Sequence, residues 1–149
     1  MPPLSVAIAI ILSNDGNVLI CQRGQGGSFA GLWEFPGGKF EPGETPADCL
    51  RRELREELDI EVEVMDELEV VEHDYAAVRV RLHPFVCRLA SGVPRPLACQ
   101  QFKWIKIGCL RDYQFPQANT NLIAQVVEKY SAGQNKMGDE GLEPPTSRV

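Results

Sequence analysis

The sequence predicts an α/β domain in which a mixed β-sheet lies between helices. Short apolar runs typical of strands recur along the chain, and two segments with helical periodicity separate and close them. Strands that alternate with helices in this way are typical of α/β and α+β folds. With 149 residues, the chain is long enough for one domain with its own hydrophobic core.

The first elements follow from apolar runs and turn residues. The run from Leu4 to Leu12 is almost continuously apolar, which predicts a largely buried strand. The pair Asp15-Gly16 predicts a hairpin turn, and residues 18–23 form the returning strand. Residues 24–43 hold many of the glycines, and we expect them to form a loop that leads into a helix.

The first helix has a clear beginning and a clear buried face. Thr45 is a good N-cap, and Pro46 suits the first helical position. The apolar stripe that recurs at helical spacing consists of Ala47, Leu50, Leu54 and Leu58. We therefore expect this helix to pack on the sheet through that stripe.

The second half of the chain continues the strand pattern. A strand pair is expected at 60–64 and 68–75, and a longer strand at 77–89, where apolar residues alternate with arginines. His83-Pro84 in the longer strand predicts a strand irregularity rather than a metal ligand. The remaining predictions are a loop at 91–97, a strand at 102–107 and a closing amphipathic helix at 121–130.

The first helix carries three carboxylates on one side. Glu53, Glu56 and Glu57 are neighbours on the helix surface because they are three, four and one residues apart. Like charges at this spacing destabilise a helix unless a positive group lies among them. Carboxylate oxygens are ligands that suit Mg²⁺ or Mn²⁺ next to substrate phosphates. The alternative is a solvated surface helix, in which Arg52 pairs with Glu56.

The wider spacing resembles a known signature. Gly38, Glu44, Arg52-Glu53 and Glu56-Glu57 occur in the order and spacing of the Nudix box, G-x5-E-x7-R-E-U-x-E-E-x-G-U, where U is a bulky aliphatic residue. The chain therefore resembles the Nudix family, which implies a Nudix fold and metal-dependent hydrolysis. Asp59 stands where the family has glycine, and Asp tolerates the left-handed backbone better than most residues.

The resemblance extends to the MutT branch of the family. It includes Arg23, the segment WEFPGG at 33–38 and the segment FPQAN at 115–119. By this resemblance the metal ligands are Glu53, Glu56, Glu57 and the carbonyl of Gly37, and the catalytic residues are Glu53, Arg52 and Glu44. The implied substrate-binding residues are Arg23, Glu34, Lys39, Phe115 and Asn119. The implied reaction is hydrolysis of 8-oxo-dGTP to its monophosphate and pyrophosphate.

Asn119 suits an oxidised guanine for a chemical reason. Normal guanine presents two acceptors, O6 and N7, on its Hoogsteen edge. Oxidation at C8 turns N7 into a donor, and a carboxamide offers one donor beside one acceptor. The alternative is that Asn119 only caps the helix that follows it, because Asn is a favoured N-cap.

Ala98 and Asp59 depart from the family pattern and leave other functions open. Many relatives have an additional acidic metal ligand six residues before the tryptophan represented by Trp104, and this chain has Ala98 there. One alternative is hydrolysis of CTP, 5-methyl-dCTP or nucleoside triphosphates in general. Another is a catalytically silent domain that only binds nucleotide, which Ala98 and Asp59 would favour and the intact glutamate set opposes.

Composition excludes several classes of partner. The formal net charge of −6 argues against a nucleic acid polymer, which requires a basic face. No apolar stretch is long enough for a membrane span. The five dispersed cysteines are typical of reduced thiols in a cytoplasmic protein, and two histidines make a zinc site improbable on ligand grounds.

The chain divides into two parts by composition. Residues 1–130 form the predicted domain, which is expected to act as a monomer or homodimer. Residues 131–149 hold few apolar side chains, so we expect a disordered tail without catalytic function.

Overall fold

The computed structural model describes residues 2–131. Ser131 ends the described chain, so the rest of the predicted tail lies outside the described residues. The strands are β1 (Leu4–Ile11), β2 (Asn17–Gln22), β3 (Trp33–Glu34), β4 (Gly37–Lys39), β5 (Glu61–Glu67), β6 (Val71–Asp74), β7 (Arg79–Ser91) and β8 (Gln101–Lys106). The helices are α1 (Pro46–Leu58) and α2 (Thr120–Val126), with 3₁₀ turns at Ile107–Asp112 and Gln117–Asn119 and a π-helical turn at Val127–Ser131.

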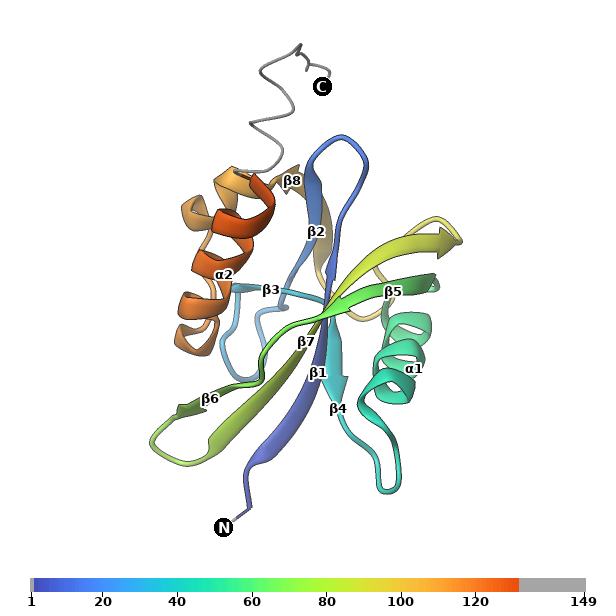
Figure 1. Cartoon of the computed structure of the whole chain (residues 1–149). Coiled ribbons are helices and arrows are strands. Elements are labelled where there is room, and N and C mark those ends of the chain that lie inside the picture. Colours follow the sequence, from blue (N-terminus) through green and yellow to red (C-terminus); the bar gives the residue numbers. More distant parts are fainter. Residues whose placement is uncertain (1, 132–149) are drawn as a thin grey trace.

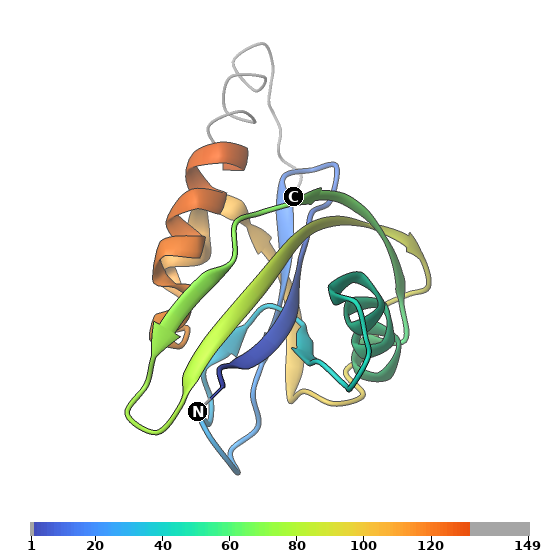
Figure 2. The ribbon, with the colours of Figure 1, turned by 60° about the horizontal axis from the view of Figure 1, so that its bottom comes forward.

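The strands form two sheets between the helices. The larger sheet has the order β4-β1-β7-β5, with β6 also paired to β7, and it is mixed because β1 and β7 run parallel. The smaller sheet is antiparallel, with the order β3-β2-β8. Helices α1 and α2 lie on opposite sides of the strands (Figure 1), and β1 runs beside β7 between them (Figure 2). The predicted mixed α/β fold is confirmed.

Three local predictions differ from the structure. Strands β3 and β4 lie within the segment expected to be a loop, where they pair with β2 and β1. They were not predicted because their few residues have no strand-like apolar pattern of their own. Strands β5 and β6 were expected to pair with each other, but each pairs with β7. The closing helix changes to a π-helical turn at Val127.

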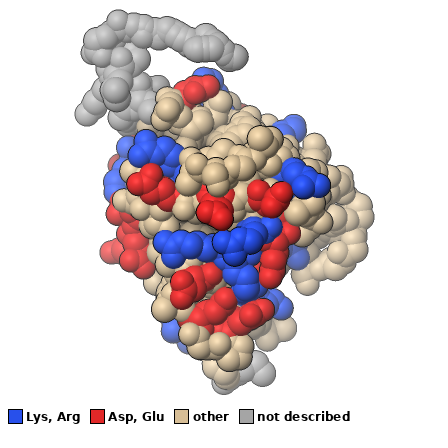
Figure 3. All heavy atoms as spheres, turned by 90° about the vertical axis from the view of Figure 1, so that its right-hand side faces the viewer, with Lys and Arg blue, Asp and Glu red and all other residues tan. Residues whose placement is uncertain are grey.

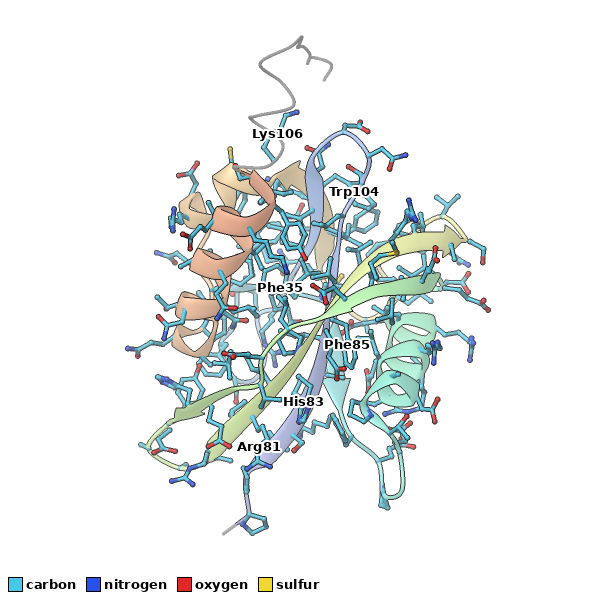
Figure 4. The ribbon with its side chains drawn as sticks, in the orientation of Figure 1. Phe35, Arg81, His83, Phe85, Trp104 and Lys106 are labelled. Carbon is cyan, nitrogen blue, oxygen red and sulfur yellow. The ribbon has the colours of Figure 1, made fainter. Side chains whose placement is uncertain are left out.

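The irregularity predicted at His83-Pro84 lies where β7 changes its antiparallel partner from β6 to β5. Strand β6 pairs with β7 as far as Leu82, and β5 begins its pairing at Phe85. Between them, the Leu68 N–H donates a hydrogen bond to the Pro84 carbonyl at 3.0 Å, a typical length for backbone amides. Figure 4 shows His83 along β7 with Arg81 and Phe85, and the His83 ring lies 4.9 Å from that of Phe40.

Strand β1 divides the hydrophobic core into two parts. Ile8 and Ile10 pack in the cluster that contains the residues of α2, whereas Ala7, Ala9 and Ile11 pack in the cluster that contains the residues of α1. Successive side chains of a strand point to opposite faces, so a strand buried on both faces is apolar throughout. This explains why residues 4–12 show no polar alternation.

Helix α1 begins and ends as its sequence predicts. The Thr45 hydroxyl accepts a hydrogen bond from the Asp48 N–H at 3.1 Å, which satisfies one of the free donors of the first turn. Leu50, Leu54 and Leu58 are fully buried, whereas Ala47 of the predicted stripe is only half-buried and Cys49 is buried instead. The helix thus presents its apolar face to the cluster on its side of β1.

Asp59 ends α1 in the left-handed conformation. Its φ of 59° and ψ of 43° are the values expected of the glycine that the family pattern has there. The loop after β7 then covers the helix end, because Arg95 N–H bonds to the Leu58 carbonyl at 2.9 Å and Leu97 N–H to the Glu57 carbonyl at 3.0 Å. The loop that carries Ala98 is therefore fixed to the end of α1.

The backbone at Asp59 generates a stability prediction. Asp59→Ala should lower the free energy of unfolding by about 1 kcal/mol, because alanine tolerates the left-handed region poorly. Asp59→Asn should have a much smaller effect, since asparagine adopts this conformation readily and the exposed ion pair to Arg95 contributes little. Denaturant unfolding of both variants tests this, and equal losses would show that the ion pair rather than the backbone matters.

Candidate active site

A cavity of about 660 Å³ lies along the larger sheet. Side chains of β1 and β7 line its walls, together with residues of the β2–β3 loop, β4 and the turn between β6 and β7. Glu57 of α1 lies in its lining, as does Asn119, which immediately precedes α2. The cavity therefore joins the acidic helix to the residue expected to recognise a base.

Asn119 is buried at the cavity and does not cap α2. Its side chain is 8% exposed, and its amide Nδ2 donates to the Pro116 carbonyl at 3.3 Å. The backbone of Asn119 is already helical, and its side chain makes no cap hydrogen bond. Within residues 2–131, no donor bonds to its side-chain carbonyl oxygen, Oδ1. A buried acceptor without a protein partner is available to a ligand.

Tyr75 connects the β6–β7 turn to the Asn119 segment. Its hydroxyl accepts a hydrogen bond from the Ala118 N–H at 2.9 Å. Its ring lies 4.6 Å from that of His73 and also lines the cavity. Tyr75 thereby fixes the backbone immediately before Asn119.

Glu57 is a partly buried carboxyl group with one backbone donor. Its Oε1 accepts a hydrogen bond from the Gly37 N–H at 3.1 Å. Desolvation, and after it the nearby carboxyl of Glu34, raises the pKa of Glu57 to about 8, against the opposing effect of that hydrogen bond. A carboxylate buried beside a second carboxylate is costly unless a cation is near.

Two glycines of β4 permit close packing on its two neighbours. A Cβ at Gly38 would overlap the Glu53 carboxylate of α1, and a Cβ at Gly37 would overlap the Ala7 carbonyl of β1. Gly37 also has a φ of 149°, which few other residues adopt. Gly38 of the Nudix box thus lets Glu53 lie against β4, whereas Gly37 lets β4 lie against β1.

Arg52 neutralises the other carboxylates of the site. Its guanidinium bonds to Glu44 at 2.6 Å and to Glu53 at 3.0 Å. The hydrogen bond from Arg52 lowers the pKa of Glu44 to about 2. Glu56 also pairs with Arg52, at 3.3 Å, but its side chain is 61% exposed. Figure 3 shows the face that α1 occupies in Figure 1, where basic side chains lie between acidic ones.

The other predicted residues fall into two groups. Arg23 and Glu34 both line the cavity and form an ion pair at 2.8 Å, and exposed Lys39 lies at the cavity as well. Phe115 is not part of the cavity lining, and its ring packs on that of the lining residue Phe35 at 5.2 Å. Figure 4 places Phe35 in the interior of the fold.

The donor set of this site fits a divalent cation. Within residues 2–131, no three acidic, histidine or cysteine side chains are arranged as a ready-made ligand set. Glu53 and Glu56 contact Arg52, whereas Glu57 contacts Gly37. The carboxylates of Glu53, Glu56 and Glu57 nevertheless offer oxygen donors, and the partly buried Glu57 has no cationic side chain in contact with it among residues 2–131. Oxygen donors with excess negative charge suit a hard cation.

Comparison with known proteins agrees with this geometry. Residues 7–125 match the model of the NUDIX domain. The chain belongs to the Nudix family. It is 32% identical to the 8-oxo-dGTP diphosphatase of Haemophilus influenzae over 126 residues, which cover 85% of this chain and 93% of that enzyme.

Two further relatives are informative. The CTP pyrophosphohydrolase of Escherichia coli is 42% identical over 76 residues, which are 51% of this chain and 56% of that protein. A solved structure from a study of MutT from Aliivibrio salmonicida and Vibrio cholerae matches with a TM-score of 0.69 and 30% identity, and covers 87% of this chain and all of that one (100%). The chain is therefore a Nudix hydrolase, and enzymes of this family generally need divalent metal ions.

Two residues of the cavity, Phe29 and Tyr75, were not predicted from the sequence. Tyr75 lies at a strand end, where an aromatic side chain is ordinary, and only the fold brings it to Ala118. Phe29 lies in the glycine-rich segment that was expected to be a plain loop. A search for apolar residues within glycine-rich loops could have singled out Phe29.

In the described part of the chain, no helix is long and apolar enough to cross a membrane.

The contact of Gly38 with Glu53 predicts a specific loss. Gly38→Ala should lower kcat/KM by about a hundredfold, because the new methyl group displaces the Glu53 carboxylate. Gly24→Ala is the matched control, since a Cβ there meets nothing within 4 Å. Steady-state kinetics, with circular dichroism to confirm folding, measure the effect. Unchanged activity of folded Gly38→Ala would show that the position of Glu53 is unimportant.

The pKa of Glu57 predicts pH-dependent metal affinity. A cation binds the ionised carboxylate, and protons compete for Glu57 below its pKa of about 8. Affinity for Mg²⁺ should therefore rise between pH 6 and pH 8, by at most about tenfold per pH unit for one proton released. Calorimetric titration measures this. Glu57→Gln should bind more weakly and lose most of the pH dependence, whereas a flat wild-type profile would contradict the prediction.

Proposed function

We propose that this Nudix hydrolase converts 8-oxo-dGTP and water into 8-oxo-dGMP and pyrophosphate, which removes an oxidised purine from the nucleotide pool. The observation that carries the proposal is Asn119, a buried carboxamide with a free carbonyl oxygen at the cavity. Its donor and acceptor complement the acceptor and donor of the oxidised Hoogsteen edge. Normal guanine would leave the acceptor of Asn119 unpaired, which is costly in a buried site.

The acidic helix supplies the second requirement. Glu53, Glu56, Glu57 and the carbonyl of Gly37 would hold Mg²⁺, or Mn²⁺ in its place, beside the triphosphate. When bound, such an ion polarises phosphoryl oxygens and lowers the pKa of a coordinated water. Ala98 offers no additional carboxylate ligand, so water is the expected ligand in that position.

The residues around the cation divide the remaining tasks. Glu53 accepts a proton from the attacking water, and Arg52 holds its carboxylate through the 3.0 Å contact. Glu44 in turn fixes Arg52, so that both act as positioning residues. Arg23 and Lys39 offset charge on the phosphates, and Glu34 orients Arg23.

A cytidine nucleotide is the second candidate substrate. Over about half of this chain, the identity to the CTP pyrophosphohydrolase is 42%, which is higher than the 32% to the 8-oxo-dGTP diphosphatase over a longer span. A carboxamide can also bond to cytosine, which presents an N4 donor. In either case the substrate is a small nucleotide. We propose that the protein acts on it as a monomer or a homodimer.

Substrate selectivity tests the proposal. We expect kcat/KM with Mg²⁺ to be at least about a thousandfold higher for 8-oxo-dGTP than for dGTP, because the normal base leaves buried polar groups unpaired. CTP and 5-methyl-dCTP belong in the same assay. Asn119→Ala should collapse the preference for 8-oxo-dGTP over dGTP.

Two controls make the result specific. Glu53→Gln should abolish most turnover of every substrate, which shows that the activity belongs to this site. Val93→Ala, a change at an exposed residue outside the cavity, should leave the preference intact. Comparable rates on CTP and 8-oxo-dGTP would favour the cytidine candidate, and selectivity that survives Asn119→Ala would remove Asn119 from base recognition.

A further inference from the structure

Two aromatic side chains from distant segments meet at the cavity. The rings of Phe29, in the loop between β2 and β3, and Tyr75, between β6 and β7, lie 5.3 Å apart at an angle of 55°. Both residues line the cavity. A tilted pair at this separation is a favourable aromatic contact. It connects the loop that follows Arg23 to the turn that is hydrogen-bonded to the Asn119 segment.

Phe29 has an unfavourable backbone and an exposed side chain. Its φ is 57°, in the left-handed region that bulky residues rarely adopt. Its side chain remains 41% exposed, so burial in the free protein compensates this strain only in part. An apolar ring held in this way beside a cavity has surface that a ligand can cover.

The rest of the lining lacks an exposed aromatic surface. Phe35 is the remaining aromatic residue of the described lining, and it is 2% exposed and packed on Phe115. The sheet contributes the aliphatic side chains of Leu4, Val6, Ile8, Val80 and Leu82 to the lining, and Val78 joins them from the turn before β7. A flat base whose edge is fixed by Asn119 still has two faces to cover, and stacking on an aromatic ring covers one of them.

We propose that Phe29, held by its contact with Tyr75, is a specificity-determining residue that contacts the base or sugar of the bound nucleotide. This inference rests on the proposed function, because it assigns an additional residue to the same nucleotide site. Phe29 has no charge or hydrogen-bonding group with which to bind phosphate. Its neighbour Ser28 instead holds Arg23, whose Nε donates to the Ser28 carbonyl at 2.9 Å.

Paired substitutions separate the ring from the backbone. Phe29→Asn removes the ring but tolerates the left-handed conformation, whereas Phe29→Tyr keeps an aromatic ring. Phe29→Asn should raise KM for the preferred nucleoside triphosphate about tenfold, as expected for a lost base stack, with little change in kcat. Phe29→Tyr and Val93→Ala should behave like the wild type.

A probe without a base tests which part of the substrate Phe29 contacts. Inorganic tripolyphosphate, used as a competitive inhibitor, should inhibit Phe29→Asn and the wild type equally. An equal loss of tripolyphosphate and nucleotide affinity would overturn the inference, because it would show that the substitution disturbs the Arg23 region. An unchanged KM in Phe29→Asn would overturn it as well.

A binding measurement distinguishes this inference from the proposed function. Calorimetry with 8-oxo-dGMP and CMP gives dissociation constants that do not depend on turnover. Weaker binding to Phe29→Asn, with normal binding to Phe29→Tyr, supports the inference. If the wild type hydrolyses nucleotides and Phe29→Asn binds the monophosphates normally, only the role of Phe29 fails. If the wild type neither binds nor hydrolyses any of them, both proposals fail.

Discussion

The contact of helix α1 with strand β4 is the constraint on which the site depends. Gly37 donates its N–H to Glu57, and Gly38 leaves the space that the Glu53 carboxylate fills. Strand β4 is itself held by antiparallel pairing to β1, a strand whose side chains lie in both halves of the core. The acidic helix is therefore positioned, through β4, by a strand that is buried on both faces.

The positive charge near this contact is shared unequally among the four carboxylates. Arg52 contacts the carboxylates of Glu44, Glu53 and Glu56, so one guanidinium serves the solvent side of the helix. Glu57 has no cationic side chain in contact with it among residues 2–131, and desolvation together with the nearby Glu34 carboxyl raises its pKa. A protein that keeps such a group partly buried retains a local need for positive charge. This need, more than the number of glutamates, distinguishes the site from a solvated helix surface.

Local sequence signals predicted the parts of the molecule that local chemistry decides. Thr45 and Pro46 marked the start of α1, and the order of glycines and glutamates marked its acidic face. The pairing of β3 and β4 could not be predicted, because strands of two and three residues have no periodicity and form only where a neighbour accepts them. That Phe115 packs on Phe35 and stays outside the cavity lining likewise depends on the fold, because Phe35 lies 80 residues earlier by their sequence numbers.

The alternating burial of β1 has a consequence for how this chain can change over generations. Insertion of one residue within β1 would exchange the isoleucines that face α2 with the alanines that face α1, and would move the partner of β4 by one position. The bulkier side chains would then press on the acidic helix. Length variation should consequently accumulate in the Asn14–Gly16 turn, while β1 and β4 keep a fixed length among functional descendants.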